Sequence, residues 1–141
     1  LLIQADVGLG QVLYGMTKEK LKIYQIWMTA SAFQIPLRDA SVDAAVCIRL
    51  SHHLPTSKQR EDLLAELLRM ARQYVVMTFF DYQSIKNILR RLRYSRPKLT
   101  MTVSQVSSIA AIHGAKLAAC PRLSIIGSGH RYALLVKTPA L

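Results

Sequence analysis

Two adjacent histidines, His52 and His53, follow a short and nearly continuous apolar run over residues 42–48. A run of this length predicts a buried strand in the centre of a parallel sheet that is covered on both faces. In open α/β sheets, ligands bind beyond the carboxyl ends of the strands. Arg49, Ser51 and the two histidines are therefore predicted to line a site. Because adjacent side chains point in different directions, we expect at most one histidine to face a ligand. Packing against the next helix is the alternative for each of them.

The elements that position these residues can be located from capping signals and periodicity. Thr56 with Gln59, and Thr102 with Gln105, have the capping-box spacing that begins a helix, and Gly114 is placed to end the second helix in a left-handed conformation. The β-branched and aromatic residues 74–80 predict another buried strand, adjacent and parallel to residues 42–48. Residues 81–92 are expected to be helical. Residues 115–123, weakened by Pro121, and 131–137 predict two antiparallel strands around the turn at 126–130.

The segment IPLRDASVDAAVC (residues 35–47), followed by HHL (residues 52–54), resembles the class I S-adenosylmethionine-dependent methyltransferases of the type 11 kind. The resemblance covers residues 30–137, the methyltransferase-like core of a single partial domain over residues 1–141. It implies an α/β fold with a Rossmann-like, mostly parallel sheet and a carboxyl-terminal antiparallel hairpin, incomplete in its amino-terminal half. It also implies S-adenosyl-L-methionine as cofactor.

Residues 1–29 depart from the family's pattern. Asp6, Gly8 and Gly10 resemble its glycine-rich loop, but Val12 stands where a third glycine is expected, and Ser31 replaces the family's Asp next to the adenine. The family places two further strands before residues 41–43, the first ending in an acid for the ribose hydroxyls. Here about 30 residues intervene, room for one helix at residues 18–24 and little more. The segment is either an authentic shortened half or a truncated or frameshifted one.

The resemblance assigns roles to individual residues of this chain. His53 and His52 are the candidates for catalysis. Cofactor binding is assigned to Asp6, Gly8, Gly10, Ser31, Ala32, Phe33, Cys47 and Arg49. Charge and position, rather than the resemblance, predict substrate or anion binding by Asp81, Arg90, Arg91, Arg93, Tyr94, His130 and Arg131. Cys47 also suits a core position, and helix capping is an equal alternative for Asp81.

The formal net charge is +11, and five cations fall within residues 90–98. They can meet an anionic substrate, lipid headgroups or a phosphate backbone, or form the solvated end of a helix. A nucleic acid is not favoured, because Tyr94 is the one aromatic within the run. The same cations are compatible with peripheral contact with a membrane. Self-association is favoured by an apolar patch expected near residues 30–37, where the missing strands of the amino-terminal half would pack.

At 141 residues and 51% hydrophobic, the chain can bury the core of one domain. It contains neither an apolar run of transmembrane length nor the pattern of a signal peptide, so a cytoplasmic location is expected. Cys47 and Cys120 suggest no disulfide framework, and no ligand spacing predicts a metal. The missing initial Met suggests a fragment.

These observations favour methyl transfer from S-adenosylmethionine to a small-molecule, lipid or saccharide-type acceptor. Such chemistry requires alignment and at most a general base, because the cofactor carries the reactive group. A non-catalytic remnant or partner subunit with the same fold is the alternative, and an RNA or tRNA methyltransferase is a further one. Whether the chain is an active enzyme by itself is left open.

Overall fold

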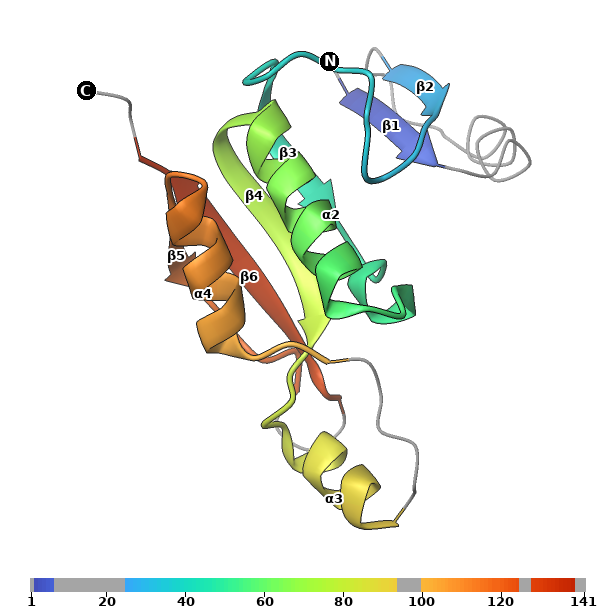
Figure 1. Ribbon diagram of the computed structural model, residues 1–141, viewed down its shortest axis with the longest axis vertical. Coiled ribbons are helices and arrows are strands. Elements are labelled where there is room, and N and C mark those ends of the chain that lie inside the picture. Colours follow the sequence, from blue (N-terminus) through green and yellow to red (C-terminus); the bar gives the residue numbers. More distant parts are fainter. Residues whose placement is uncertain (1, 7–24, 94–99, 125–127, 139–141) are drawn as a thin grey trace. The chain divides into compact units, whose positions relative to one another are not determined.

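The computed structural model describes residues 2–6, 25–93, 100–124 and 128–138 (Figure 1). The chain divides into two compact units, Leu1–Pro36 and Leu37–Leu141, and each is described by itself. The predicted helix at residues 18–24 and the predicted loop glycines Gly8 and Gly10 lie outside the described residues.

Unit 1 contains two strands that pair in parallel, β1 (Leu2–Asp6) and β2 (Gln25–Thr29). The sequence analysis did not predict β2, which occupies the interval that was expected to hold one helix and little more. A turn follows β2, in which the backbone N–H of Gln34 donates to the carbonyl of Ser31 at 3.2 Å. Unit 1 therefore has a strand, a connection through residues 7–24, and a parallel strand.

Within the described residues of unit 2, four strands form a sheet in the order β3-β4-β6-β5. These are β3 (Val42–Cys47), β4 (Ala71–Phe80), β5 (Ala115–Ala119) and β6 (His130–Lys137). β3 and β4 are parallel, whereas β6 runs antiparallel to both β4 and β5. The α/β, Rossmann-like fold with a carboxyl-terminal antiparallel pair is thus confirmed.

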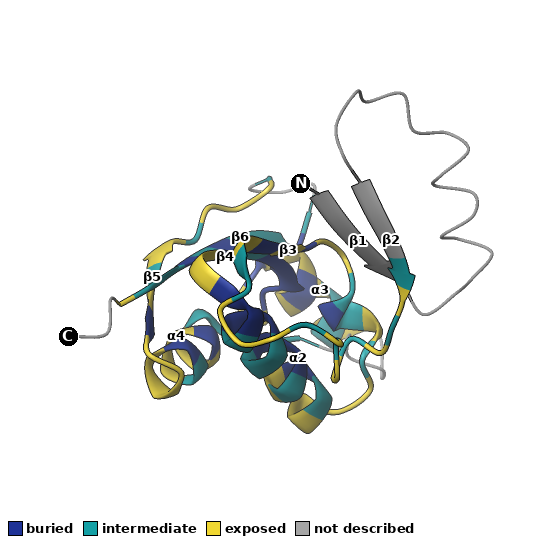
Figure 2. Cartoon of the chain, turned by 90° about the horizontal axis from the view of Figure 1, so that it is seen from above, coloured by how far each residue is buried: buried dark blue, intermediate teal, exposed yellow. Residues whose placement is uncertain are grey.

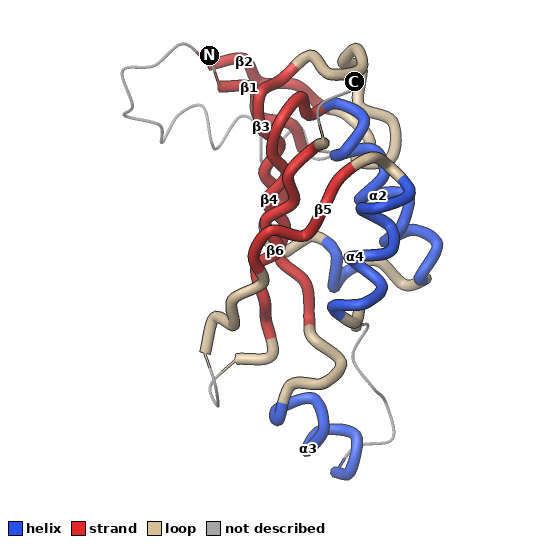
Figure 3. The backbone as a smooth tube through the Cα atoms, turned by 90° about the vertical axis from the view of Figure 1, so that its left-hand side faces the viewer, coloured by secondary structure: helices blue, strands red, loops and turns tan. Residues whose placement is uncertain are grey.

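Helices α2 (Ser57–Met70) and α4 (Val103–Ile112) lie on one face of this sheet (Figure 3). Both begin with the predicted capping boxes, at Thr56 and Thr102. Their inner sides are buried, as the dark-blue stripes in Figure 2 show. Leu63, Leu64 and Leu68 of α2 are fully buried, and so are the strand residues on the same side of the sheet: Val75, Met77, Phe79, Ala133 and Leu135. Gly114, at φ +67°, ends α4 as predicted.

The prediction that residues 42–48 form a central strand is wrong in its position. The structure places β3 at the edge of the four-stranded sheet of unit 2 and ends it at Cys47. Ala45 and Cys47 are buried on the helix side, whereas Val46 is 65% exposed on the other. An apolar run of strand length therefore identified the strand and its parallel partner, but its hydrophobicity did not report burial on both faces.

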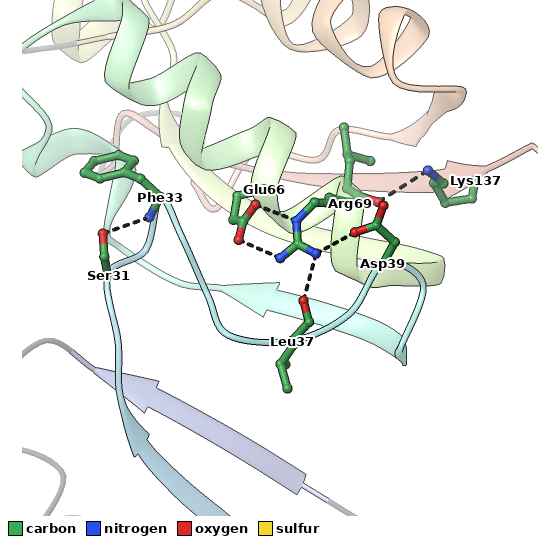
Figure 4. Close-up of polar contacts among 8 residues, drawn as sticks. Ser31, Phe33, Leu37, Asp39, Glu66, Arg69 and Lys137 are labelled. Carbon is green, nitrogen blue, oxygen red and sulfur yellow. Dashed lines mark hydrogen bonds and ion pairs between the residues drawn. The ribbon is translucent and has the colours of Figure 1, made fainter.

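The turn that leads into β3 is fixed by Arg69 of α2 (Figure 4). Its guanidinium donates to both carboxylate oxygens of Glu66 at 2.8 Å, and to the Leu37 carbonyl and the Asp39 carboxylate at 2.7 Å. Together these hydrogen bonds hold the Glu66 and Asp39 carboxylates, and they raise the pKa of the Arg69 guanidinium. The contacts attach the polar turn to the covering helix, so the end of β3 has a defined direction.

Two shorter helices follow the carboxyl ends of β3 and β4. They are the 3-10 helix η1 (Ser51–His53) and α3 (Ile85–Arg93). The helix predicted over residues 81–92 therefore begins four residues later, because the Asp81 carboxylate instead accepts from the Gln83 N–H at 2.9 Å. Figure 3 shows α3 beyond the end of the sheet. No helix in the described ranges is long and apolar enough to cross a bilayer.

Candidate functional site

A cleft of about 210 Å³ lies in unit 2, at the carboxyl ends of β3 and β4. It is lined by residues from the loop after β3, from η1, from the end of β4, from α3, and from the segment that leads into β6 and its first residue. The lining residues are Arg49, His52, Phe80, Lys86, Asn87, Arg90, Ser128, Gly129 and His130. The sequence predicted a site beyond the carboxyl end of the first of these strands, and a cleft is present there.

Arg49 reaches the cleft from a backbone turn with a positive φ of 62°, which is unfavourable for a residue with a Cβ. Thr78 of β4 holds this turn in place. The Arg49 N–H donates to Thr78 Oγ1 at 2.6 Å, and Ser51 Oγ donates to the Thr78 carbonyl at 2.8 Å. The buried Thr78 side chain and backbone carbonyl of the neighbouring strand thus hold a conformation that the local sequence would not adopt alone.

Three rings gather on one side of the cleft. The Phe80 ring lies 3.9 Å from the His130 ring and 4.8 Å from the His52 ring, centroid to centroid. The two histidine rings are 5.4 Å apart, and His130 Nδ1 is 2.9 Å from Ser128 Oγ. Packing and the serine contact therefore restrict both imidazoles, which is what a positioned proton acceptor requires.

The opposite side of the cleft is the polar side of α3. Lys86, Asn87 and Arg90 lie there, and Asn87 is buried, with Nδ2 donating to the Asp81 carbonyl at 2.6 Å. Gly129 passes close to this helix: a Cβ at that position would lie 3.0 Å from Asn87 Nδ2 and 3.0 Å from Ser84 Oγ. A larger residue at position 129 would therefore force these two side chains to shift by a few tenths of an ångström where the chain crosses the start of α3.

Below the cleft, Asp81 is 1% exposed and forms an ion pair with Arg131, whose Nε donates to Oδ2 at 2.7 Å. This hydrogen bond raises the pKa of the Arg131 guanidinium. Arg131 Nη1 also donates to the Cys120 carbonyl at 3.0 Å. Both charges are thus engaged in holding the end of β4 to β6.

The cleft is electropositive. Its lining among the described residues contains three cations, Arg49, Lys86 and Arg90, and no carboxylate. In the described part of the chain, no group of three His, Cys, Asp or Glu side chains could hold a metal ion. Nearby on β3, burial raises the pKa of the Cys47 thiol to about 11, so this thiol is neutral at physiological pH.

The structure brings four of the predicted site residues together: Arg49, His52, Arg90 and His130 line the one cleft. His53 is exposed and does not line it, although its ring lies 4.1 Å from that of His52. Six other predicted residues are also absent from the described lining: Cys47, Ser51, Asp81, Arg91, Arg93 and Arg131. Tyr94, like Gly8 and Gly10, lies outside the described residues.

The remaining predicted cofactor residues belong to unit 1. Asp6 is the last residue of β1, and Ser31, Ala32 and Phe33 lie in the turn after β2. Ser31 Oγ accepts from the Phe33 N–H at 3.3 Å (Figure 4), and the Phe33 side chain is 39% exposed.

Sequence reasoning missed five residues of the cleft, which are Phe80, Lys86, Asn87, Ser128 and Gly129. For Lys86 a signal was present, because it lies four residues before Arg90 on a helix and so faces the same side. For Ser128 and Gly129 the sequence offered no signal except a composition typical of turns, because their position beside α3 depends on the pairing of β4 with β6.

Comparison with known proteins agrees with this fold. A family model described as a methyltransferase domain matches residues 6–79. The chain belongs to this family, the class I S-adenosylmethionine-dependent methyltransferases, whose cofactor is S-adenosylmethionine. A search of curated proteins finds no significant match.

Solved structures of low sequence identity share the fold. Magnesium protoporphyrin IX methyltransferase from Synechocystis PCC 6803, with bound SAH, superposes with a TM-score of 0.82 at 16% identity over 98% of this chain. This chain covers 64% of that protein's chain. An S-adenosylmethionine-dependent methyltransferase from Methanosarcina mazei superposes with a TM-score of 0.75 at 13% identity. The match covers 96% of this chain and 81% of the other. The [4+2]-cyclase SpnF superposes with a TM-score of 0.71 at 11% identity. The match covers 98% of this chain and 66% of the cyclase chain.

Proposed function

We propose that this chain takes part in methyl transfer from S-adenosylmethionine, and that the cleft of unit 2 binds the acceptor through an anionic group. The observation that carries the proposal is the lining of that cleft: three cations and two restrained imidazoles, with no carboxylate among the described lining residues. A small molecule, a lipid or a saccharide precursor that bears a phosphate or carboxylate has the matching chemistry.

The same charges disfavour the cofactor's sulfonium in this cleft. A cation about 5 Å from another, at an effective dielectric constant of about 20, is repelled by roughly 3 kcal/mol. Arg49, Lys86 and Arg90 would each add such a term. The cleft therefore suits the acceptor better than the reactive end of the cofactor.

For the cofactor itself, unit 1 offers suitable groups. The family places an acid at the end of its second strand, for the ribose hydroxyls, and a third parallel strand after the next helix. Asp6 ends β1, and β2 follows after residues 7–24 and pairs with β1 in parallel. We therefore assign Asp6 to the ribose rather than to a glycine-rich loop. The Ser31–Phe33 turn follows β2, where the exposed Phe33 ring is available to the adenine.

When bound, the cofactor supplies an electrophilic methyl group. The chain's own residues then have three tasks. Arg49, Lys86 and Arg90 hold the acceptor's anionic group and so orient the atom to be methylated. Phe80 fixes the two imidazoles beside that group, and His52 or His130 takes the proton that an acceptor oxygen or nitrogen loses.

Two other functions remain as alternatives. A methyltransferase-fold subunit without cofactor binding is one, and the cyclase among the similar structures illustrates that the fold does not determine the reaction. An RNA or tRNA methyltransferase is the other. The small cleft favours a phosphate or carboxylate over a tracked polynucleotide, which needs an extended basic groove.

Calorimetric titration with S-adenosylhomocysteine tests the proposal. We expect binding by the wild-type chain and a loss of at least about tenfold in Asp6→Asn, because a charge-assisted hydrogen bond contributes about 1.5–3 kcal/mol. Asp62→Asn is the matched control, since Asp62 is a surface acid of α2 paired with Lys58. Gly8→Ala separates the two assignments of Asp6: it should leave affinity unchanged if Asp6 ends a ribose-binding strand, and abolish it if Gly8 belongs to a cofactor loop.

A chain that is folded but does not bind S-adenosylhomocysteine contradicts the proposal and favours the non-catalytic subunit. Binding that survives Asp6→Asn but is lost in Gly8→Ala contradicts the assignment of Asp6 to the ribose and restores the glycine-rich loop.

A further inference from the structure

Helix α3 turns an apolar stripe toward solvent. Ile85, Ile88, Leu89 and Leu92 recur at i, i+3, i+4 and i+7, so they share one side of the helix. These residues are 44%, 40%, 58% and 81% exposed, in that order. A surface helix normally buries such a stripe against the core. An exposed one of this kind marks a binding surface.

The orientation of α3 follows from its polar side. Lys86, Asn87 and Arg90 face the cleft, on the side of the helix opposite to the apolar stripe. Asn87 is 4% exposed, and its hydrogen bond to the Asp81 carbonyl attaches the helix to the end of β4. Rotation of α3 to bury the stripe would remove Asn87 from this contact and leave a buried carbonyl without its donor. The stripe therefore stays outside.

Cations flank the apolar stripe. Arg91 lies with its guanidinium 3.8 Å from the centre of the Tyr82 ring and donates to the Tyr82 carbonyl at 2.8 Å, and Arg93 lies one turn after Leu89. The helix contains no acidic residue. A short helix with an apolar side, flanking arginines and an adjacent exposed tyrosine has the pattern of helices that lie in the interface of a lipid bilayer.

We propose that α3 docks on an anionic lipid surface, with the side chains of Ile85, Ile88, Leu89 and Leu92 inserted at the boundary of headgroups and acyl chains. The positive charge of the chain favours an anionic bilayer over a second copy of the chain as the binding partner of this stripe. A second copy of the chain would bring the same arginines and another +11 of net charge against the stripe, which disfavours association. An anionic bilayer offers both an apolar layer and phosphates for Arg91 and Arg93. The proposal does not depend on methyl transfer.

The experiment is sedimentation of the full chain with vesicles of phosphatidylglycerol and phosphatidylcholine, or of phosphatidylcholine alone. We expect binding to the first, weakened by added salt, and little binding to the second. Leu89→Ser with Leu92→Ser should reduce the affinity by at least about tenfold. Ile112→Ser on α4 is the matched control. Ile112 is 79% exposed, close to the 81% of Leu92, but it lies on a helix without cations in its last turn. Circular dichroism establishes whether each variant is folded. If the double variant does not fold, the single substitution Leu92→Ser is tested in its place.

Three results would overturn the proposal. One is equal binding to the two vesicle types. Another is unchanged vesicle binding in the leucine variants, which would assign the interaction to free anion binding by arginines. The third is a concentration-dependent dimer that the leucine substitutions dissociate, without any vesicle binding, which would assign the stripe to a second copy.

Discussion

The guanidinium of Arg131 donates from Nε to the buried carboxylate of Asp81 at 2.7 Å, across 50 residues of sequence. The two residues join the end of β4 to the start of β6, immediately below the cleft. The Asp81 N–H also donates to the Gly129 carbonyl at 2.8 Å, so both the side chain and the backbone of Asp81 hold the segment that carries His130. The ion pair thus connects the stability of the fold to the geometry of the candidate site.

Removal of the cation should destabilise the protein strongly. Arg131→Met leaves the Asp81 carboxylate buried without its counter-charge, and the expected loss is about 3–5 kcal/mol in the free energy of unfolding. Urea denaturation measures it. Asp81→Asn combined with Arg131→Met should recover part of this loss, because the neutral amide carries no buried charge. Arg38→Gln, at an exposed position, is the control and should stay within about 0.5 kcal/mol of the wild type. A loss below 1 kcal/mol in Arg131→Met would show that water reaches Asp81.

This pair illustrates what the sequence could and could not predict. Asp81 and Arg131 were both singled out, as substrate-binding candidates or, for Asp81, as a cap. Their mutual contact depends on the register in which Phe79 pairs with Arg131 across β4 and β6. Local patterns, such as the capping boxes at Thr56 and Thr102, were readable because each involves residues three positions apart. Register between distant strands leaves no such local signal.

The positive φ of Arg49 leads to a second prediction, on stability and on anion binding. Its φ of 62° suits glycine, so Arg49→Gly should leave stability unchanged or raise it by about 1 kcal/mol, since the relief of strain exceeds or balances the added entropy of the unfolded chain. The same variant should bind inorganic pyrophosphate less tightly, because one of the cleft's cations is lost. Chemical denaturation and calorimetry measure the two effects.

Ala40→Gly is the matched control, because Ala40 is exposed and has a φ of 48° but does not line the cleft. It should share the effect on stability and leave pyrophosphate affinity unchanged. A loss of more than 1 kcal/mol in Arg49→Gly would mean that the arginine side chain itself holds the loop.

Two of the three arginines in the last turn of α3, Arg90 and Arg93, should behave differently toward small anions. Arg90 lines the cleft and Arg93 does not, although both belong to one basic run. Arg90→Gln should weaken pyrophosphate binding about fivefold to tenfold, through loss of a charge-assisted hydrogen bond, whereas Arg93→Gln should have little effect. Equal effects of both substitutions would indicate diffuse attraction by net charge rather than a defined site.

The composition of the run predicted anion binding, yet it could not separate these arginines. Helical spacing alone places Lys86 and Arg90 on one side of the helix, but which side of the helix faces the cleft depends on how α3 packs against the end of β4. The exposed stripe of α3 escaped the sequence analysis for the same reason. Apolar residues at helical spacing normally predict a buried face, and only the contacts of Asn87 show that this face is turned outward.

Cys47 should make stability depend on pH in the alkaline range. Burial raises its pKa from the ordinary 9.0 to about 11, so between these values the folded protein keeps a proton that the unfolded chain loses. The associated stability is fully present below pH 9 and decreases as the pH rises to about 11, by roughly 2 to 3 kcal/mol in total. Lysines and tyrosines titrate in the same range, so the quantity to measure is the difference in unfolding free energy between the wild type and Cys47→Ala. This difference should fall steadily from pH 8.5 to 10.5, and a difference that stays constant would show that the thiol is accessible to water in the folded state.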